Sequence, residues 1–178
     1  MLPPDRLRAL LREQDDPAHL ELPADYDVPA ARARFACLAD ALRRRFGPSV
    51  TAGHGQDASF LGYVSVPAGA SGADRPLWVL LSNFGPFVTA GTGDAWGVPG
   101  CEEGLSAPFV TWLDDLCGEL GCVYVPVALL LEPYDGPSLG EDEEAEAILA
   151  ALAAQDDEEA EEEDDLPPSW WDRYFQYM

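Results

Sequence analysis

The segment Leu77–Thr92 constrains the fold most, because it contains two β-rich runs joined by turn-forming residues. Leu77–Leu81 is continuously apolar and rich in β-forming side chains, which is typical of a strand covered on both faces. Gly85 and Pro86 favour a turn, since glycine tolerates positive φ and proline fixes its own φ. Phe87–Thr92 then resumes as a second, weaker strand. We therefore expect a hairpin at the centre of an antiparallel sheet.

Three further segments have the pattern of strands. Val50–His54 and Ser59–Val66 lie on either side of a short turn, and Ser59–Val66 shows the period of two that a sheet requires. Ala68–Asp74, rich in Gly, Ala and Ser, is expected to be a loop. Cys122–Val127 is a fifth strand candidate, followed by one helical turn at Ala128–Leu131. Because consecutive strands usually neighbour each other, the first four are expected to form a meander.

Apolar residues at helical spacing predict three helices and a short aromatic one. The first begins at Pro3-Pro4 and carries one apolar stripe: Leu7, Leu10 and Leu11. The second runs from Pro29 to about Phe46, and the third begins at Pro108 and ends at Gly121. Ser169 is expected to cap the aromatic helix. The predicted fold class is α+β, with a four- to five-stranded, mainly antiparallel sheet packed by helices.

The length of 178 residues suits one domain with an attached excursion. We expect an α+β core domain over residues 1–140 and an acidic, low-complexity insertion over 141–168. Residues 169–178 are predicted to form a C-terminal helix that docks on the core. Five aromatic side chains support this docking, because exposing them to water is unfavourable: Trp170, Trp171, Tyr174, Phe175 and Tyr177.

Charge is the strongest global property of the chain. There are 33 acidic residues against ten basic ones, all arginine, which gives a net charge of −23. Glu141–Asp165 holds 14 of the carboxylates, and the remaining 19 against ten arginines still leave −9. Such a body repels nucleic acid and anionic lipid, so direct binding to either is disfavoured and a basic protein partner is favoured.

The composition also indicates a compartment and a source. No apolar run approaches the roughly 20 residues that span a bilayer, so no membrane association is expected. The N-terminal segment lacks the basic start and apolar block of a secretory signal, and we expect a cytoplasmic protein. Exclusive use of Arg, with abundant Ala, Gly and Pro, is typical of a GC-rich bacterial genome.

Residues that would support catalysis or metal binding are sparse. There is no Cys-x-x-Cys pair, and Cys37, Cys117 and Cys122 are expected to be buried, reduced thiols on apolar faces. His54 is the one plausible catalytic base, but no Gly-x-Ser-x-Gly nucleophile motif accompanies it. Gly91-Thr92-Gly93 lacks the following Lys-Ser/Thr of a phosphate loop. We therefore predict no catalytic residues, no metal, no cofactor and no enzymatic activity.

Clustered carboxylates are instead the candidate partner-binding residues: Glu102, Glu103, Asp114, Asp115, Glu119, Glu141, Asp142 and Glu144. Arg43, Arg44 and Arg45 end the second predicted helix. Two interpretations of this cluster remain open. It complements the negative end of the helix dipole and pairs with the acidic segment, or it forms a binding patch of its own.

The C-terminal two-thirds resembles a family. The segments that carry the resemblance are Leu80–Gly85, Tyr124–Pro126, Leu131–Gly136 and Ser169–Tyr177. They are similar to segments of small, acidic bacterial proteins of the immunity type, which are cytoplasmic and block a toxin's active site. The resemblance implies an α+β domain closed by structural residues: Trp171, Tyr174, Phe175, Tyr134, Asp135 and Gly136. The acidic insertion departs from this pattern, so its role stays open.

Three functions follow as hypotheses. The leading one is a non-enzymatic immunity-type inhibitor that neutralises a basic toxin domain by charge complementarity. The second is an acidic mimic of nucleic acid that occupies a DNA-binding protein. The third is an enzyme of unknown type that uses the Gly93–Pro108 loop.

Overall fold

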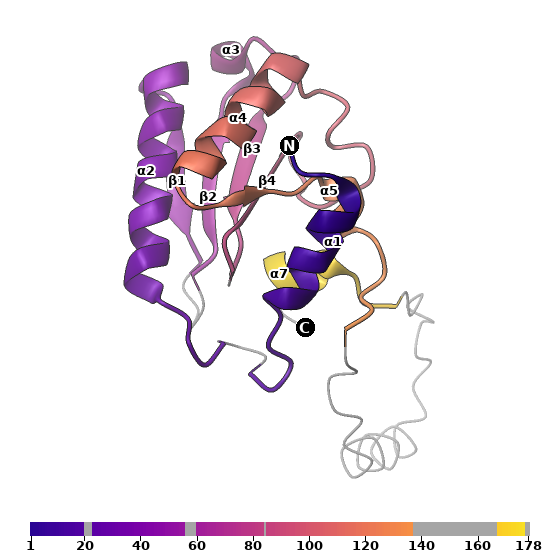
Figure 1. Cartoon of the computed structure of the whole chain (residues 1–178). Coiled ribbons are helices and arrows are strands. Elements are labelled where there is room, and N and C mark those ends of the chain that lie inside the picture. Colours follow the sequence, from indigo (N-terminus) through magenta and orange to yellow (C-terminus); the bar gives the residue numbers. More distant parts are fainter. Residues whose placement is uncertain (20–22, 56–59, 84, 137–166, 177–178) are drawn as a thin grey trace, which may run out of the picture.

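The computed structural model in Figure 1 describes residues 1–19, 23–55, 60–83, 85–136 and 167–176. The helices are α1 (Pro4–Glu13), α2 (Val28–Phe46), α3 (Ala68–Ser71), α4 (Ala107–Glu119), α5 (Val127–Leu130) and α7 (Trp170–Phe175). The strands are β1 (Thr51–His54), β2 (Gly62–Val66), β3 (Leu77–Leu81), β4 (Phe87–Thr92) and β5 (Val123–Tyr124). The predicted α+β class is confirmed, whereas residues 141–166 of the predicted acidic insertion lie outside the described residues.

The five strands form one sheet in the order β1-β2-β3-β4-β5. The first four pair antiparallel, as the meander prediction expected, and β5 pairs parallel with β4. The fifth strand is shorter than predicted and ends before Pro126. This residue lacks an N–H for the ladder and instead caps α5, which begins at Val127.

Helices cover both faces of this sheet (Figure 1). Helices α2 and α4 pack on one face around a cluster that includes Phe35, Val79 and Leu113. The other face is covered by α1, α5 and α7, whose cluster includes Leu80 and other large side chains. Because successive strand residues point to opposite faces, β3 contributes Val79 to one cluster and Leu80 to the other. This explains its uninterrupted apolar sequence.

Two local expectations were wrong. Cys37 is exposed, because it lies on the opposite side of α2 from the buried Phe35. Part of the expected Ala68–Asp74 loop forms the short helix α3. All six residues of β4, which is expected to be the weaker strand of the hairpin, are buried.

The C-terminal helix α7 is bound to the N-terminal helix and to the end of β3. Ser169 and Asp172 form a capping box at its start. The Tyr174 hydroxyl donates a hydrogen bond to the Leu11 carbonyl at 2.7 Å, and the Asn83 backbone N–H donates to the Tyr174 carbonyl at 2.9 Å. These contacts join segments from both ends of the described chain into one layer.

The segment before the insertion adds to this layer. The Tyr134 ring lies edge-on to Trp170 at 4.7 Å, and its hydroxyl donates to Asp15 at 2.5 Å. Asp135 forms an ion pair with Arg12, and Gly136 lies so close to the Tyr134 ring that no side chain fits there. Trp171 stacks on Phe175 with ring centroids 5.1 Å apart. All six residues expected to be structural therefore lie in or beside this layer.

A pH-dependent contact joins α1 to the end of α5. Arg8 donates two hydrogen bonds to Glu132, at 2.8 and 2.7 Å, and these hold the pKa of Glu132 below its ordinary value of 4.5. A carboxylate with a lowered folded-state pKa stabilises the fold fully above its unfolded pKa, and this stabilisation is lost as the pH falls through the folded value. Below about pH 4.5, the free energy of unfolding of the Glu132→Gln variant should therefore decline less steeply than that of the unchanged protein. Urea denaturation at a series of pH values measures this difference. An unchanged pH profile would contradict this assignment.

No described helix has the length and apolar character needed to cross a membrane.

Candidate functional site

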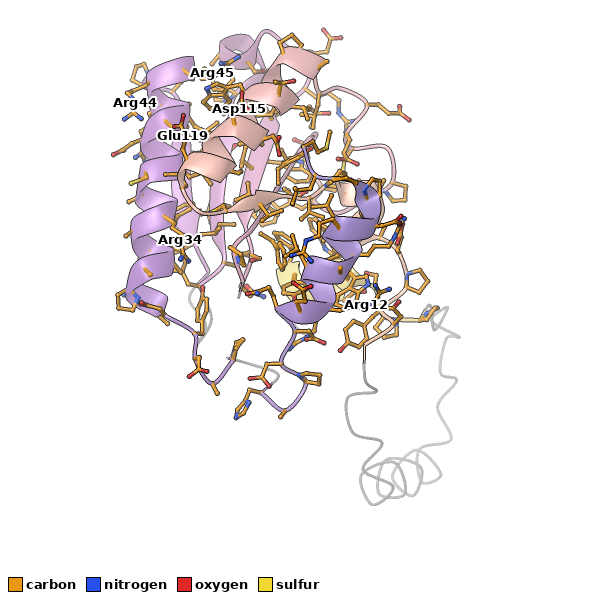
Figure 2. The ribbon with its side chains drawn as sticks, in the orientation of Figure 1. Arg12, Arg34, Arg44, Arg45, Asp115 and Glu119 are labelled. Carbon is orange, nitrogen blue, oxygen red and sulfur yellow. The ribbon has the colours of Figure 1, made fainter. Side chains whose placement is uncertain are left out.

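The exposed face formed by α2 and α4 carries charges of both signs (Figure 2). Asp115 and Glu119 lie one turn apart on α4, and both are exposed. Helix α2 contributes Arg34, Arg44 and Arg45 to the same side of the molecule. Within the described residues, no ion pair joins the two helices. Asp115 and Glu119 are therefore available to an external cation.

Neighbouring aromatic rings hold one of these arginines in place. The Arg45 guanidinium lies over the Trp112 ring at 4.4 Å and over Phe46 at 5.6 Å, a cation–π arrangement. Arg43, two residues earlier, pairs with Asp40 at 3.2 Å. Complementation of the helix dipole, one of the two predicted interpretations, fits the position of all three arginines in the last turn of α2. Their pairing with the acidic segment lies outside the described residues.

The other predicted partner-binding residues are dispersed. Glu102 accepts a hydrogen bond from the Ala128 backbone N–H at 2.9 Å and lies 3.5 Å from the Tyr124 hydroxyl. Burial, assisted by this carboxylate, raises the pKa of Tyr124. Glu102 thus satisfies backbone at the start of α5 rather than facing a partner. Asp114 pairs with the amino group of Met1 on a different side of α4.

Glu103 is exposed and lies in the 93–106 loop, beside a shallow pocket that also contains Arg75. Of the predicted carboxylates that the structure describes, Asp115 and Glu119 are therefore the two that it brings together on one exposed face. Glu141, Asp142 and Glu144 lie outside the described residues.

An acidic cleft of about 570 Å³ was not predicted from the sequence. We define it by five carboxylates and one arginine: Glu13, Asp15, Asp16, Asp25, Asp27 and Arg34. These residues come from the end of α1, the turn before α2, and α2 itself. Gly85, Pro86 and Gly121 complete the walls. All six charged residues lie within residues 13–34, but the sequence does not show that Gly85, Pro86 and Gly121 close a cleft around them.

The carboxylates of the acidic cleft differ in their partners. Asp15 is fully engaged by Arg173, at 2.7 Å, and is almost completely buried. The Asp16 carboxylate lies 2.9 Å from a ring nitrogen of His19 and accepts a hydrogen bond from the Ala24 N–H. These two contacts lower the pKa of Asp16. Asp27 caps α2 through the Ala30 N–H at 2.9 Å.

Two members of the cleft have weaker partners or none. Glu13 pairs with Arg6 at 2.8 Å, but both side chains are about half exposed, so this pair exchanges easily with solvent or another cation. Asp25 is exposed and has no ion-pair partner within the described part of the chain. Both carboxylates are therefore available to a cation that enters the cleft.

Tyr26 lies against these carboxylates. Its hydroxyl oxygen is shielded from solvent and has no hydrogen-bond partner within the described residues, and burial raises its pKa to about 12. The hydroxyl is therefore protonated at neutral pH and adds no charge to the cleft. Arg34 is its one cationic member, so the cleft carries a net negative charge.

Features that would suggest catalysis are engaged in structure. His54 is exposed at the end of β1, where its ring contacts the Gly55 carbonyl at 2.9 Å. The 93–106 loop is anchored to the sheet, because the Thr92 N–H and hydroxyl both donate to the Cys101 carbonyl, at 2.7 and 3.1 Å. Burial raises the pKa of the Cys117 and Cys122 thiols, which disfavours the reactive thiolate. Within the described ranges, no three His, Cys, Asp or Glu side chains are placed so that they could hold one metal ion.

Comparison of the chain with family models, with curated proteins and with solved structures finds no match.

Proposed function

We propose that this chain is a non-enzymatic, cytoplasmic immunity-type inhibitor that binds and neutralises a basic toxin domain by charge complementarity. The observation that carries the proposal is the acidic cleft, in which carboxylates outnumber cations and Asp25 and Glu13 are available to an external cation. A lysine or arginine side chain that enters such a cleft gains attraction from several carboxylates at once.

The α4 carboxylates extend this negative surface. Gly121, which lines the acidic cleft, follows Glu119 by two residues, and Asp115 lies one turn earlier on α4. An approaching cationic domain therefore meets negative charge both at the cleft and along the adjacent helix. Such an arrangement accelerates association by electrostatic steering and makes it dependent on salt.

A growth assay tests the proposal. The basic toxin domain is first recovered by pull-down from native lysate, and cells that produce it should survive when the chain is co-produced. The triple variant Asp25→Asn/Asp115→Asn/Glu119→Gln should lose most of this protection, because it removes three carboxylates that have no ion-pair partner in the described structure. Asp74→Asn is a matched control, since Asp74 is also exposed but lines a different pocket. Equal protection by all three proteins would contradict the proposal.

Deletion of residues 155–165 distinguishes the inhibitor from a mimic of nucleic acid. The deleted residues are almost all carboxylates and lie outside the described structure. A mimic of nucleic acid would lose most of its binding, because those carboxylates take the place of the phosphate charges. An inhibitor that uses the folded acidic face would keep much of it.

A further inference from the structure

The strand β1 forms an open edge of the sheet. It is the first strand in the order β1-β2-β3-β4-β5 and, within the described part of the chain, pairs with β2 alone (Figure 1). Thr51 and His54 are exposed, and the two residues between them are half-buried. An open edge is a template for another strand, because half of its backbone polar groups point outward.

The pairing register identifies those outward groups. The Gly55 N–H donates to the Leu61 carbonyl at 2.9 Å, which makes residues 55 and 61 a hydrogen-bonded pair. Hydrogen-bonded pairs alternate along an antiparallel ladder, so Gly53 and Thr51 also bond to β2. Ala52 and His54 therefore direct their N–H and C=O groups away from the sheet. Within the described residues, the N–H and C=O groups of Ala52 and His54 form no backbone hydrogen bond.

The two faces beside this edge differ in chemistry. On one face, the Tyr63 ring lies across Gly53, which has no side chain to block it, and packs against Trp96 at 5.6 Å. Trp96 and Val98 are 39% and 41% exposed, which is unusual for large apolar side chains in this structure. This face offers an apolar platform next to the open edge.

The other face is basic. Arg32 of α2 lies over the Phe60 ring at 5.8 Å, and Phe60 in turn contacts His54 at 5.3 Å. Arg43 lies three turns further along the same stripe of α2 and is partly neutralised by Asp40. No carboxylate occurs in Thr51–His54. Arg32, which has no ion-pair partner within the described residues, therefore gives the α2 side of β1 an uncompensated positive charge in a chain whose net charge is −23.

We propose that β1 binds an extended segment of another protein in which acidic and apolar side chains alternate. Backbone groups of that segment pair with Ala52 and His54. Its carboxylates face Arg32 and Arg43, and its apolar side chains face Tyr63 and Trp96. Strand addition of this type obtains affinity from the main chain and specificity from alternate side chains. A second copy of this chain fits less well, because it would place the basic flanks of two α2 helices against each other.

A peptide titration followed by amide NMR tests this proposal. The probe is an eight-residue peptide that alternates glutamate and valine, with blocked ends. It should shift the amide signals of Ala52 and His54 and the indole signal of Trp96. The same peptide with lysine in place of glutamate should bind at least about tenfold more weakly. Equal binding of both peptides, or no shift at Ala52 and His54, would overturn the proposal.

Variants separate the backbone contribution from the charge contribution. Ala52→Pro removes an outward N–H without removing a bond to β2, so it should abolish binding while the sheet stays paired. Arg32→Glu should weaken binding of the glutamate peptide by at least about tenfold and strengthen binding of the lysine peptide. Arg44→Glu is the charge control, because Arg44 lies on a different stripe of α2 and should change little. If Ala52→Pro impairs folding, the Arg32 and Arg44 pair still decides the outcome.

Discussion

Replacement of Arg173 by methionine is expected to lower the free energy of unfolding by about 3–5 kcal/mol. Arg173 and Asp15 form an ion pair at 2.7 Å, and their side chains are only 2% and 3% exposed. Arg173 also donates to the Asp16 carbonyl at 3.1 Å, so it links α7 to the segment after α1. Methionine fills a similar space but leaves the Asp15 carboxylate buried without its cation, which is strongly unfavourable.

Urea denaturation measures this change, and Arg6→Met provides the control. Arg6 also forms an ion pair at 2.8 Å, with Glu13, but both side chains are about half exposed. Its loss should change the free energy of unfolding by less than about 1 kcal/mol. Similar effects of the two substitutions would show that burial of the Arg173–Asp15 pair does not determine its contribution to the free energy of unfolding.

Gly97→Ala is the second substitution with a large expected effect, about 2–5 kcal/mol of destabilisation. Gly97 has a φ of 66°, a left-handed conformation that other residues adopt at a cost. An added methyl group would also overlap the Trp171 ring. This ring is fixed by contacts with Phe175 and Trp78, with centroids 5.1 and 6.3 Å away, so it has little room to move.

Gly72→Ala separates these two causes. Gly72 has a similar φ of 72°, but nothing lies within 4 Å of an added methyl group. It should therefore show only the backbone cost, about 1 kcal/mol. Thermal and urea unfolding of the two variants should differ by about 1–3 kcal/mol, the contribution of the overlap with Trp171. Equal destabilisation would mean that the 93–106 loop does not press against α7.

The central hairpin could be predicted from sequence to the residue. β3 and β4 begin and end where the apolar runs begin and end, because the intervening Gly85 and Pro86 interrupt both. The end of β5 was harder to predict, since Pro126 terminates the strand and starts a helix within an apolar run. Strand boundaries can be predicted from local sequence where the segment itself contains the residues that end the strand.

The sites that depend on distant residues could not be predicted. Asp15 and Arg173 are 158 residues apart, and the identity of either gives no indication of its partner. Glu102 was expected on a charged surface, but it reaches a backbone N–H 26 residues later in the chain. The charged residues of the acidic cleft are close in sequence, at 13–34, but its walls are completed by the distant Gly85, Pro86 and Gly121. Tertiary packing creates these contacts, and sequence periodicity does not encode them.

Calorimetric titration with a basic toxin domain recovered by pull-down from native lysate tests the central claim most directly. The account predicts tight binding at about 50 mM NaCl and at least about tenfold weaker binding at about 500 mM, because salt screens the attraction between exposed charges. The triple variant Asp25→Asn/Asp115→Asn/Glu119→Gln should bind weakly at both concentrations. An affinity that is insensitive to salt and to these substitutions would contradict charge complementarity as the basis of recognition.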